Sequence, residues 1–501
     1  MGMKSIRSIL FDQNGNKLAQ SALPIVTSLT GEYVTQSPEE WWEKACYVIR
    51  ESSSEAGVPV DYLTVTASSS CLVCVGKEGE ALYPCMMVSD KRAREESRYL
   101  ESLPEFFSVK EKTGLDADPS FLIPKALWIK NREKEIYDKT YQFLSPNDYL
   151  IAKLTGNYVT DYINALKWHY YAEEKRYPSE WLRQIGIGEE MLPKVVAPGT
   201  NVGRIQEKAA KETGLSTATQ VIVSTYDAIC SFVGSGVAEK GEASDVSGTV
   251  TVFRAVSDRC LWEDLDGIQQ IPYYEGGLHI VGGSNNLGGG LIEWVKQCYY
   301  QNETLPYERM EKDATEASIG AGGLVFLPYL LGERAPIWDG NARGVFFGLE
   351  RMHTRKEMTR AVFESTGFID LDMIAAIEKT GTKVTSIRLS GGLARIHLIS
   401  QIKADITGRE VQVLSEFETT ATGAAMIALY GQKVYASLKE AANAFVQVRM
   451  MIRPNRKNQE MYKELYQLYK ETYQTVKPLF PKRMELTEKL YRNKRIRIEN
   501  L

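Results

Sequence analysis

Hydrophobic and polar positions along the chain follow two patterns, one typical of strands and one typical of helices. Residues 5–18 predict a hairpin, with apolar positions on both sides of the turn Asn14-Gly15-Asn16. Ser37-Pro38-Glu39-Glu40 predicts the start of a helix that runs to about Ser54, because serine caps helices, proline suits the first position and acids favour the first turn. Strands and helices in alternation indicate an α/β chain.

The same two patterns continue along the chain. Further strands are predicted at residues 63–75, 221–223, 243–256, 279–283, 324–327 and 386–389. Further helices are predicted over most of residues 120–185 and at residues 289–300, 355–377 and 398–406. After Pro454 the pattern is charged and helical and ends in the basic stretch 492–497, which we interpret as a solvated last helix. We expect a domain boundary between Val237 and Glu242, giving domains 1–240 and 241–480 and a basic tail 481–501.

Composition and charge exclude several classes of function. The 501 residues are 44% hydrophobic and 25% charged, an ordinary globular composition. A net charge of −4 gives no reason to expect nucleic acid or a membrane surface as a partner. No apolar stretch is long enough to span a bilayer, the first ten residues lack the apolar part of a signal peptide, and seven cysteines do not make a disulfide framework. We therefore expect a reduced, cytoplasmic protein.

Several catalytic motifs are absent from the sequence. It has no phosphate-binding loop of the Gly-x-x-x-x-Gly-Lys-Ser/Thr type, no Gly-x-Ser-x-Gly and no His-Glu-x-x-His. The four histidines are dispersed, which argues against a histidine-built metal site or triad. Cys71-Leu72-Val73-Cys74 matches Cys-x-x-Cys, but no second pair completes a zinc site, and we interpret it as part of an apolar strand.

Four segments place chemistry at the ends of predicted strands. They are Thr225-Tyr226-Asp227, with a carboxylate, the hydroxyl-rich turn 247–251, the glycine-rich stretch 285–290 and Ser390-Gly391-Gly392-Leu393-Ala394. Backbone N–H groups in such turns bind phosphate oxygens. Each segment alone is also typical of an ordinary turn, and Asp227 alone is also typical of a helix N-cap.

The order of these segments resembles the FGGY family of carbohydrate kinases over nearly the whole chain. The residues that carry the resemblance are Pro38-x-x-Trp41-Trp42, Asp90-Lys91-Arg92, Leu154-Thr155-Gly156, Thr160-Asp161-Tyr162-x-Asn164-Ala165, the block 326–338 with Gly332-Glu333-Arg334-Ala335-Pro336, and Ser390-Gly391-Gly392. The resemblance implies two actin-like (ribonuclease H-like) domains with a nucleotide and sugar cleft between them. It also implies ATP-dependent phosphorylation of a sugar hydroxyl with Mg²⁺.

The resemblance assigns roles to individual residues. Asp227 would be the base that takes the hydroxyl proton and, through the phosphates, a contact of Mg²⁺. Asp90 and Arg92 would bind sugar hydroxyls, with a surface salt bridge as the alternative reading. The nucleotide would be held by Gly248 and Thr249 at its terminal phosphates and lined by Gly289, Gly391 and Gly392.

Three departures from the family pattern matter. The family's first strand carries Asp-x-Gly-Thr-Thr, and Gly2-Met3-Lys4-Ser5 aligns with its turn, so we expect that Asp to fall before Met1. Ser69 and Ser70 align with the Met-His pair that xylulokinases place against the sugar, so we expect a remodelled sugar pocket. The phosphate turn reads Gly248-Thr249-Val250 instead of Gly-Thr-Ser, and Ser224-Thr225 stands where glycines usually precede the catalytic Asp of the family.

We therefore expect a kinase of a small sugar, sugar acid or polyol, xylulokinase-like by default, with no nucleic-acid or membrane partner and with a homodimer left open. The alternative is a catalytically impaired sugar-binding protein of the same fold, because the aspartate before Met1 is absent and the turns are altered.

Overall fold

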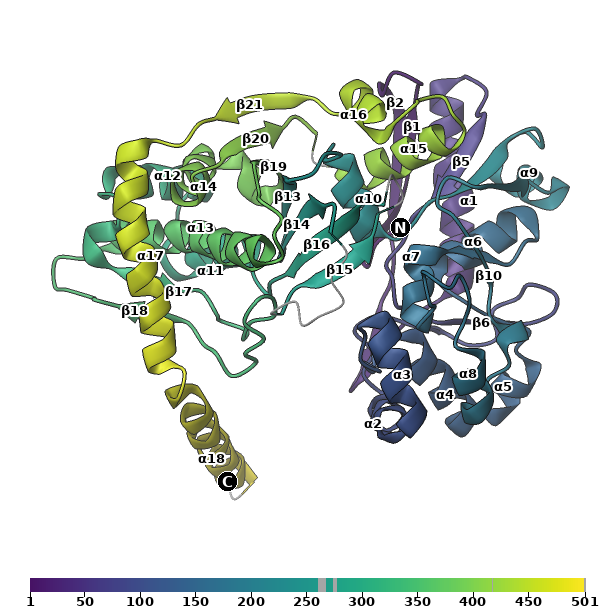
Figure 1. Cartoon of the computed structure of the whole chain (residues 1–501), viewed down its shortest axis with the longest axis horizontal. Coiled ribbons are helices and arrows are strands. Elements are labelled where there is room, and N and C mark those ends of the chain that lie inside the picture. Colours follow the sequence, from purple (N-terminus) through teal and green to yellow (C-terminus); the bar gives the residue numbers. More distant parts are fainter. Residues whose placement is uncertain (260–266, 274–276, 417, 500–501) are drawn as a thin grey trace. The chain divides into compact units, whose positions relative to one another are not determined.

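The computed structural model describes residues 1–259, 267–273, 277–416 and 418–499. This part of the chain divides into two compact units, which are described separately (Figure 1). Unit 1 comprises residues 1–236 and 418–446, and unit 2 comprises residues 237–259, 267–273, 277–416 and 447–499. Both units mix helices with strands, so the expected α/β class is confirmed.

The strands of unit 1 form several small sheets. They are β1 (Ser5–Phe11), β2 (Lys17–Pro24), β3 (Ser28–Thr30), β4 (Tyr33–Gln36), β5 (Tyr62–Val65), β6 (Val73–Val75), β7 (Cys85–Met86), β8 (Gln142–Leu144), β9 (Val159–Asp161), β10 (Lys194–Val196), β11 (Asn201–Arg204) and β12 (Gln220–Val223). β1 and β2 pair antiparallel, which confirms the predicted hairpin. β12 lies between β11 and β5 and runs parallel to β5. The buried end of β12 leads directly into Thr225-Tyr226-Asp227.

The helices of unit 1 surround these sheets. They are α1 (Pro38–Ala56), α2 (Arg94–Ser102), α3 (Pro104–Thr113), α4 (Leu122–Arg132), α5 (Lys134–Lys139), α6 (Pro146–Thr155), α7 (Tyr162–Ala165), η1 (Leu166–Trp168), α8 (Ser179–Ile185), η2 (Glu189–Met191), α9 (Glu207–Thr213), α10 (Asp227–Gly234), α15 (Thr419–Gly431) and α16 (Leu438–Phe445). The predicted start of α1 is confirmed, because the Ser37 side chain accepts a hydrogen bond from the backbone N–H of Glu40. Trp41 and Trp42 lie on the inner face of this helix and are buried in the hydrophobic core of unit 1.

The expected strand at residues 63–75 is only partly present. β5 ends at Val65 and β6 begins at Val73, so the residues between them form a loop. Ser70 in this loop has φ 57, a left-handed conformation that no strand continues through. In this loop the Ala67 carbonyl accepts the backbone N–H of Asp227 and the Ser70 carbonyl accepts the Lys125 side chain, and of its described residues only Leu72 pairs with a strand residue, Met86. Cys71 therefore lies in the loop, and only Cys74 of the Cys-x-x-Cys pair lies in a strand.

Unit 2 is built on a seven-stranded sheet of order β15-β16-β14-β13-β19-β20-β21. The strands of unit 2 are β13 (Glu242–Ser247), β14 (Thr251–Ser257), β15 (Gln269–Pro272), β16 (His279–Ser284), β17 (Val325–Leu327), β18 (Val345–Phe347), β19 (Ser386–Gly391), β20 (Glu410–Leu414) and β21 (Val448–Ile452). β13, β19 and β20 run parallel, whereas β13 and β14 are antiparallel neighbours joined by the turn 248–250. Parallel strands end at the same edge of a sheet, so the turn after β13 and the glycines after β19 lie at one edge.

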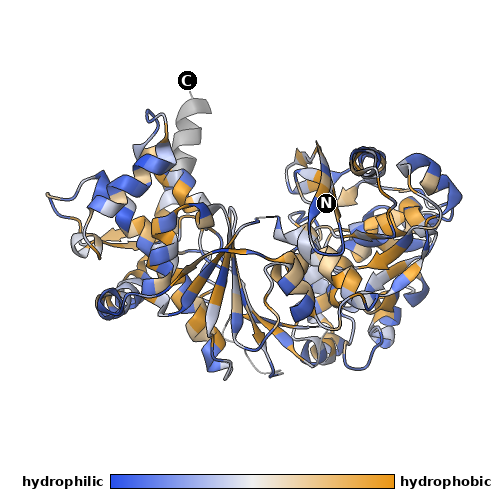
Figure 2. Cartoon of the chain, turned by 90° about the horizontal axis from the view of Figure 1, so that it is seen from above, coloured by the Kyte–Doolittle hydropathy of each residue, from blue (hydrophilic) through white to orange (hydrophobic). Residues whose placement is uncertain are grey.

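Helices pack on this sheet and on one another. They are α11 (Gly289–Tyr299), α12 (Pro306–Glu316), η3 (Ala321–Gly323), α13 (Arg355–Lys379), η4 (Gly392–Arg395), α14 (His397–Thr407), α17 (Arg456–Val476) and α18 (Leu479–Glu499). Hydrophobic positions follow the strands and the inner helix faces, and hydrophilic positions gather on the outer loops (Figure 2). α17 buries four tyrosines, so the expectation of a solvated last helix is wrong for this part of the tail. Its tyrosine face belongs to the unit 2 core.

Two glycines set the distance between α10 and α15 in unit 1. A Cβ atom added at Gly234 would lie 1.8 Å from the carbonyl oxygen of Thr419, and one added at Gly423 would lie 1.8 Å from that of Cys230. The Ser231 and Thr419 hydroxyls also hydrogen-bond across this contact, at 2.7 Å. Because α10 begins with Asp227, this contact fixes the helix that carries the candidate base.

Candidate active site

Asp227 is the first residue of α10. We call the turn that joins β12 to α10, together with Asp227, the corner. Its backbone N–H donates to Ala67 O at 2.9 Å, and Ser68 Oγ donates to the Asp227 carboxylate at 3.1 Å. The other carboxylate oxygen accepts the backbone N–H of Ala228 at 2.7 Å, as acids in the first turn of a helix do. Tyr226 and not Asp227 is the N-cap, so the alternative N-cap reading of Asp227 is wrong. The half-buried carboxylate is thus oriented by its own helix and by Ser68.

The two serines predicted for the sugar side lie in the loop that contacts Asp227. Ser69 is half-buried and Ser70 is buried. Ser68, which the sequence analysis did not select, is the member of this serine run that bonds to the Asp227 carboxylate. Ser69 and Ser70 directly follow the residue that bonds to the candidate base.

A buried lysine, also not expected from the sequence, ties this loop to the rest of the sugar side. Lys125 on α4 donates from Nζ to Ser70 O at 2.6 Å, Met87 O at 2.7 Å and Met86 O at 3.4 Å. Met87 O also accepts the backbone N–H of Asp90 at 3.0 Å. Burial lowers the pKa of Lys125 to about 8. One ammonium group thus joins the Ser70 loop to the segment that leads into Asp90.

Asp90 and Arg92 form a two-point ion pair. Arg92 Nε and Nη2 donate to the two Asp90 oxygens at 2.9 and 2.7 Å, and the backbone N–H of Val34 adds a third bond to this carboxylate. Arg92 Nη1 donates to Tyr83 OH at 3.2 Å, and the guanidinium lies 3.9 Å from the ring centre of Tyr33. The side chains of Arg92 and Asp90 are only 2% and 0% exposed, which excludes the surface salt-bridge reading. Their contact with a sugar hydroxyl stays a prediction. The observed bonds show that the ion pair shapes the part of unit 1 expected to bind the sugar.

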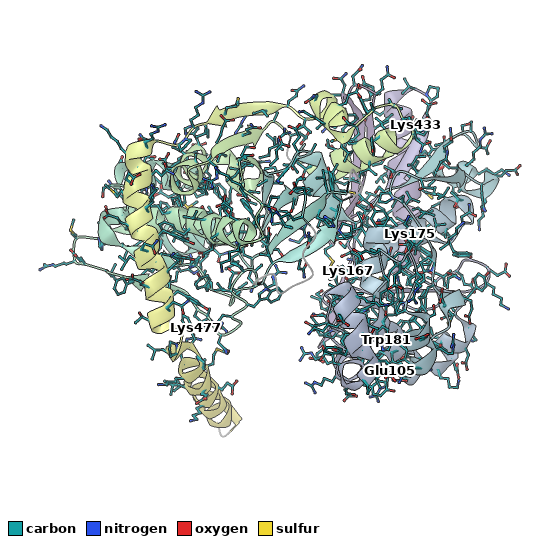
Figure 3. All side chains as sticks on the ribbon, in the orientation of Figure 1. Glu105, Lys167, Lys175, Trp181, Lys433 and Lys477 are labelled. Atoms are coloured by element: carbon teal, nitrogen blue, oxygen red, sulfur yellow. The ribbon has the colours of Figure 1, made fainter. Side chains whose placement is uncertain are left out.

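A second cation lies near the corner. Lys167 comes from η1 and is labelled in Figure 3. Its Nζ is 4.8 Å from the ring centre of Phe121 and 6.0 Å from that of Tyr226, the neighbour of Asp227. Cations over aromatic faces are held by the negative face of the ring. The sequence analysis did not select Lys167 either.

Buried polar groups support the corner from behind. Asn147 on α6 donates to Thr225 O at 3.1 Å. Asp161 is the N-cap of α7 and accepts the backbone N–H groups of Ile163 and Asn164 at 3.0 and 3.1 Å. Burial raises the pKa of Asp161 to about 6. Asp161 and Asn164 belong to the motif that carries the resemblance, and here they shape the backbone around the candidate site.

In unit 2 the candidate phosphate turn is open at its tip and fixed at its base. Gly248 and Thr249 are exposed, as a turn that receives a ligand requires. At the base, Ser247 and Thr251 are buried, and their hydroxyls hydrogen-bond at 3.0 Å. The turn therefore projects from a rigid strand pair.

The glycine-rich segment before α11 is bound to this turn. The backbone N–H of Gly289 donates to Gly248 O at 2.7 Å, and those of Gly288 and Gly290 donate to Thr249 O at 2.9 and 3.1 Å. A Cβ atom at Gly289 would lie 2.7 Å from Gly248 O, so only glycine permits this approach. Gly289 is thus next to Gly248 and Thr249, as predicted, and its own N–H is used by the turn.

The glycines at the end of β19 lie at the same edge of the sheet. Gly391 is paired with Ser247 in the register of β13 and β19. Its φ is 87, and a Cβ atom there would lie 2.4 Å from Ser247 O. Gly392 follows and is exposed. The five residues predicted to hold the nucleotide, which come from three separate segments of the sequence, therefore gather at one edge of one sheet.

Two residues of the block 326–338, Glu333 and Arg334, hydrogen-bond to the glycine-rich segment at this edge. Glu333 Oε1 accepts the backbone N–H groups of Asn286 and Arg334, each at 2.8 Å. Arg334 Nη2 donates to Asn285 O at 2.8 Å, and Asn285 Oδ1 accepts the backbone N–H of Thr251 at 2.9 Å. Burial raises the pKa of Glu333 to about 7. These bonds connect Glu333 and Arg334 to the segment that holds the turn.

The chemistry of the described residues limits the metal that fits. Within these residues, no group of three or more His, Cys, Asp and Glu side chains gathers to hold a metal ion. Mg²⁺ binds through one or two carboxylates, water and substrate phosphates, and does not need such a cage. The half-buried Asp227 carboxylate fits this role as a single oxygen donor, together with phosphates held elsewhere.

Lys125 predicts a measurable pH dependence of stability. Its pKa is about 8 in the folded chain, against 10.5 in the unfolded chain. Between these two values the unfolded chain holds a proton that the folded chain lacks, so the Lys125 contribution to stability rises with pH. We expect the free energy of unfolding of wild type, minus that of Lys125→Gln, to increase by about 3 kcal/mol from pH 7.5 to pH 10.5.

Chemical unfolding at several pH values measures this difference. Lys130→Gln, a half-buried lysine on the same helix, controls for the loss of a lysine and its carbonyl contact with Ile185. A Lys125→Gln difference that stays flat, or falls, over this range would contradict the burial of a titrating ammonium at this position.

Comparison with known proteins identifies the family. Residues 1–234 match the N-terminal domain of the FGGY family of carbohydrate kinases, and residues 244–431 match its C-terminal domain. The chain belongs to the FGGY family of carbohydrate kinases. It is 28% identical over 487 residues to the xylulose kinase of Bacillus subtilis (strain 168), which covers 93% of this chain and 94% of that protein. It is 26% identical over 455 residues to the gluconokinase of the same organism, covering 86% of each.

Solved structures agree with this family. The crystal structure of a ligand-bound xylulose kinase from Lactobacillus acidophilus matches with a TM-score of 0.88 at 26% identity, over 96% of this chain and 98% of that one. The FGGY membership expected from the motif order, the two-domain mixed α/β fold and the activity of a sugar kinase are therefore confirmed.

The site residues that the sequence analysis missed left only faint signals. Lys125 interrupts an otherwise apolar stretch of α4. This interruption is the one cue in the sequence that the lysine is buried and therefore needs polar partners. Ser68 begins a run of three serines, of which only the other two align with the FGGY sugar pair. Lys167 has no cue, because its ring neighbours Phe121 and Tyr226 are distant in sequence.

Proposed function

We propose that this FGGY kinase transfers the terminal phosphoryl group of ATP to a hydroxyl of a small sugar, sugar acid or polyol, with Asp227 as the base. One observation carries the proposal. In unit 1 the loop of Ser69 and Ser70 bonds to Asp227 through Ser68, and Lys125 links this loop through Met87 to the segment that leads into Asp90. In unit 2 the residues expected on the nucleotide side gather at one sheet edge. Each unit thus holds one coherent half of a kinase site.

The proposed step has a simple atom balance. The substrate O–H bond breaks and its proton passes to the Asp227 carboxylate. The freed oxygen forms a bond to the terminal phosphorus while the bond between that phosphorus and ADP breaks. Ser68 keeps one Asp227 oxygen in place, and the accessible part of the carboxylate receives the proton.

The nucleotide side supplies positioning and charge stabilisation. The backbone of Gly248 and the Thr249 side chain would bind the terminal phosphates, and Gly289, Gly391 and Gly392 would let the nucleotide approach the backbone closely. Mg²⁺, when bound with the phosphates and Asp227, neutralises the charge that develops during transfer.

The substrate we propose by default is a ketopentose of the xylulose type. The xylulose kinases among the relatives support this choice, and the gluconokinases support a sugar acid as the next candidate. Ser69 and Ser70 offer small, polar contacts, in line with hydroxyl recognition. The other proposed contacts are Asp90 and Arg92, whose ion pair holds the wall of this half-site.

Location and assembly follow from the same proposal. Among the described helices, none has the length and apolar character needed to cross a bilayer. We place the activity in the cytoplasm, where cells keep the ATP that it consumes. The net charge of −4 favours no nucleic acid or membrane partner, and a homodimer is the assembly to be tested.

The rival proposal is a sugar-binding member of the family with little kinase activity. It rests on the turn Gly248-Thr249-Val250 and on Ser224-Thr225 before Asp227, where the family pattern has other residues. A panel of pentuloses, aldonates and polyols with ATP and Mg²⁺, measured by ADP release, separates the two. Sugar-dependent ADP release with one class of substrate supports the kinase; sugar binding without ADP release by the same sample supports the rival.

Thr249 provides a test of the phosphate turn. Thr249→Val keeps the shape of the side chain and removes its hydroxyl. If this hydroxyl donates to a phosphate, its loss should weaken ATP binding by about 10- to 100-fold, the value of a hydrogen bond to a charged group. The KM for the sugar should stay within about twofold of wild type, because the sugar-side residues are unchanged.

Steady-state kinetics with ATP and sugar varied separately measure this split. Thr315→Val, an exposed threonine on α12 whose hydroxyl bonds only within its own helix, is the matched control. Equal ATP affinity in wild type and Thr249→Val would remove Thr249 from the phosphate site.

A further inference from the structure

Unit 2 contains a buried group of three charges directly behind the phosphate turn. Lys403 on α14 donates from Nζ to Asp245 on β13 and to Asp370 on α13, both at 2.6 Å. The side chains of the three residues are 0–1% exposed. We call Asp245, Lys403 and Asp370 the buried triad.

The triad places two carboxyl groups against one ammonium group inside the core. Burial and the neighbouring Asp245 raise the pKa of Asp370 well above its ordinary value. Lys403 Nζ donates to both carboxyl groups, and these two acidic partners raise the pKa of Lys403. A buried pair of this kind contributes little net stability, and apolar residues of the same size would pack as well. The triad therefore calls for an explanation other than stability.

One residue of the triad, Asp245, is hydrogen-bonded to the base of the turn. Ser247 Oγ donates to Asp245 Oδ1 at 2.6 Å and bonds to the Thr251 hydroxyl at 3.0 Å. Ser247 and Thr251 are the two residues that flank Gly248, Thr249 and Val250. The triad thus contacts Ser247 at one end of the turn directly and reaches Thr251 at the other end through the Ser247 hydroxyl.

The same chain of bonds continues to the glycine-rich segment. The backbone N–H of Thr251 donates to Asn285 Oδ1 at 2.9 Å, and that of Asn285 donates to Thr251 O at 3.1 Å. Asn285 begins the segment whose glycines bond to the carbonyls of Gly248 and Thr249. A displacement of Asp245 would therefore move both the turn 248–250 and the glycine-rich segment that bonds to it.

We propose that Lys403 is a positioning residue for ATP, which acts through Asp245 and Ser247 to hold the turn 248–250 in the shape that binds the terminal phosphates. The inference rests on the proposed function, because it assigns a use to the same turn. Lys403 itself is buried. Its role is to fix the two carboxylates from the helix side, so that Asp245 can hold Ser247.

Two variants test this role. The double variant Asp245→Asn/Lys403→Met removes the ion pair while keeping similar volumes. Ser247→Ala keeps the triad and removes only the hydroxyl that links it to the turn. Glu364→Gln is the control, because Glu364 forms another buried ion pair, with Arg360, in unit 2 and has no bond to the turn.

Binding of ATP with Mg²⁺ is measured by calorimetry on the full chain, and the KM for the sugar by kinetics. We expect both the double variant and Ser247→Ala to weaken ATP binding by about tenfold, with the sugar KM within about twofold of wild type. Glu364→Gln should change neither value. ATP affinity within twofold of wild type in either folded variant would overturn the proposal. If the double variant does not fold, Ser247→Ala alone decides.

A purely structural role for the triad gives a different pattern. It would lower the thermal midpoint of the double variant and of Glu364→Gln alike, and the affinities for ATP and for sugar would change by the same factor. Failure of the proposed function is also distinguishable. If Thr249→Val leaves ATP binding unchanged, the turn is not the phosphate site; if Thr249→Val weakens ATP binding and Ser247→Ala does not, only the role of the triad fails.

Discussion

Asp227→Asn is expected to lower kcat by about 10²- to 10⁴-fold, the usual contribution of a general base. Asparagine fills the same space; its Oδ1 can still accept the Ala228 N–H, and its Nδ2 can donate to the Ser68 hydroxyl, so the corner should keep its shape. It cannot take a proton from the substrate hydroxyl. ATP affinity should change little, because the residues proposed to hold the nucleotide lie in unit 2.

Single-turnover phosphorylation, with Kd values for ATP and sugar, measures this effect on the chemical step. Asp61→Asn, an exposed acid just before β5, controls for the loss of a carboxylate in unit 1. An Asp227→Asn rate within threefold of wild type, with chemistry rate-limiting, would remove Asp227 from the role of base.

Gly423→Ala is expected to impair both stability and catalysis. The new Cβ would lie 1.8 Å from Cys230 O and 2.6 Å from the backbone nitrogen of Gly234, so α10 and α15 must separate. Overpacking of this kind costs about 1–3 kcal/mol, and more where the backbone has to move. Because Asp227 begins α10, its carboxylate should shift as well, and a misplacement of about 1 Å lowers rates by about 100-fold.

The thermal midpoint and kcat of Gly423→Ala measure the two effects together. Gly340→Ala is the matched control, since its added Cβ meets no atom within 4 Å and its φ is not in the left-handed region. Unchanged stability and turnover in Gly423→Ala would contradict the close helix contact. Loss of stability with full turnover would mean that the contact does not position Asp227.

The sequence predicted most of the elements that position the site. The hairpin at residues 5–18, the start of α1 at Pro38 and the buried strand before Asp227 depend on local signals, namely turn residues, caps and apolar runs. The strand expected at residues 63–75 was partly wrong, because an apolar run does not reveal that its middle turns to bond with Lys125. That bond joins residues far apart in the sequence, and no local pattern contains it.

The candidate site was predictable in its parts but not in its supports. Glycines at strand ends and an acid after a buried strand marked Gly248, Gly391 and Asp227, and the FGGY motif order gave them roles. The groups that hold them in place are lysines and serines whose partners are distant in sequence, such as Lys125 with Met87 and Lys403 with Asp245. A lysine in an amphipathic stretch is usually solvated, so burial had to be seen in the structure.

The central claim is that this chain moves a phosphoryl group from ATP to a sugar hydroxyl with Asp227 as the base. Phosphorus NMR tests it most directly, with the chain, ATP, Mg²⁺ and the sugar that gives the largest ADP release in the panel. For wild type we expect a phosphate monoester signal that grows in step with ADP and depends on the sugar, and for Asp227→Asn at equal concentration almost none. ADP without any ester, or an ester formed as fast by Asp227→Asn as by wild type, would contradict the account.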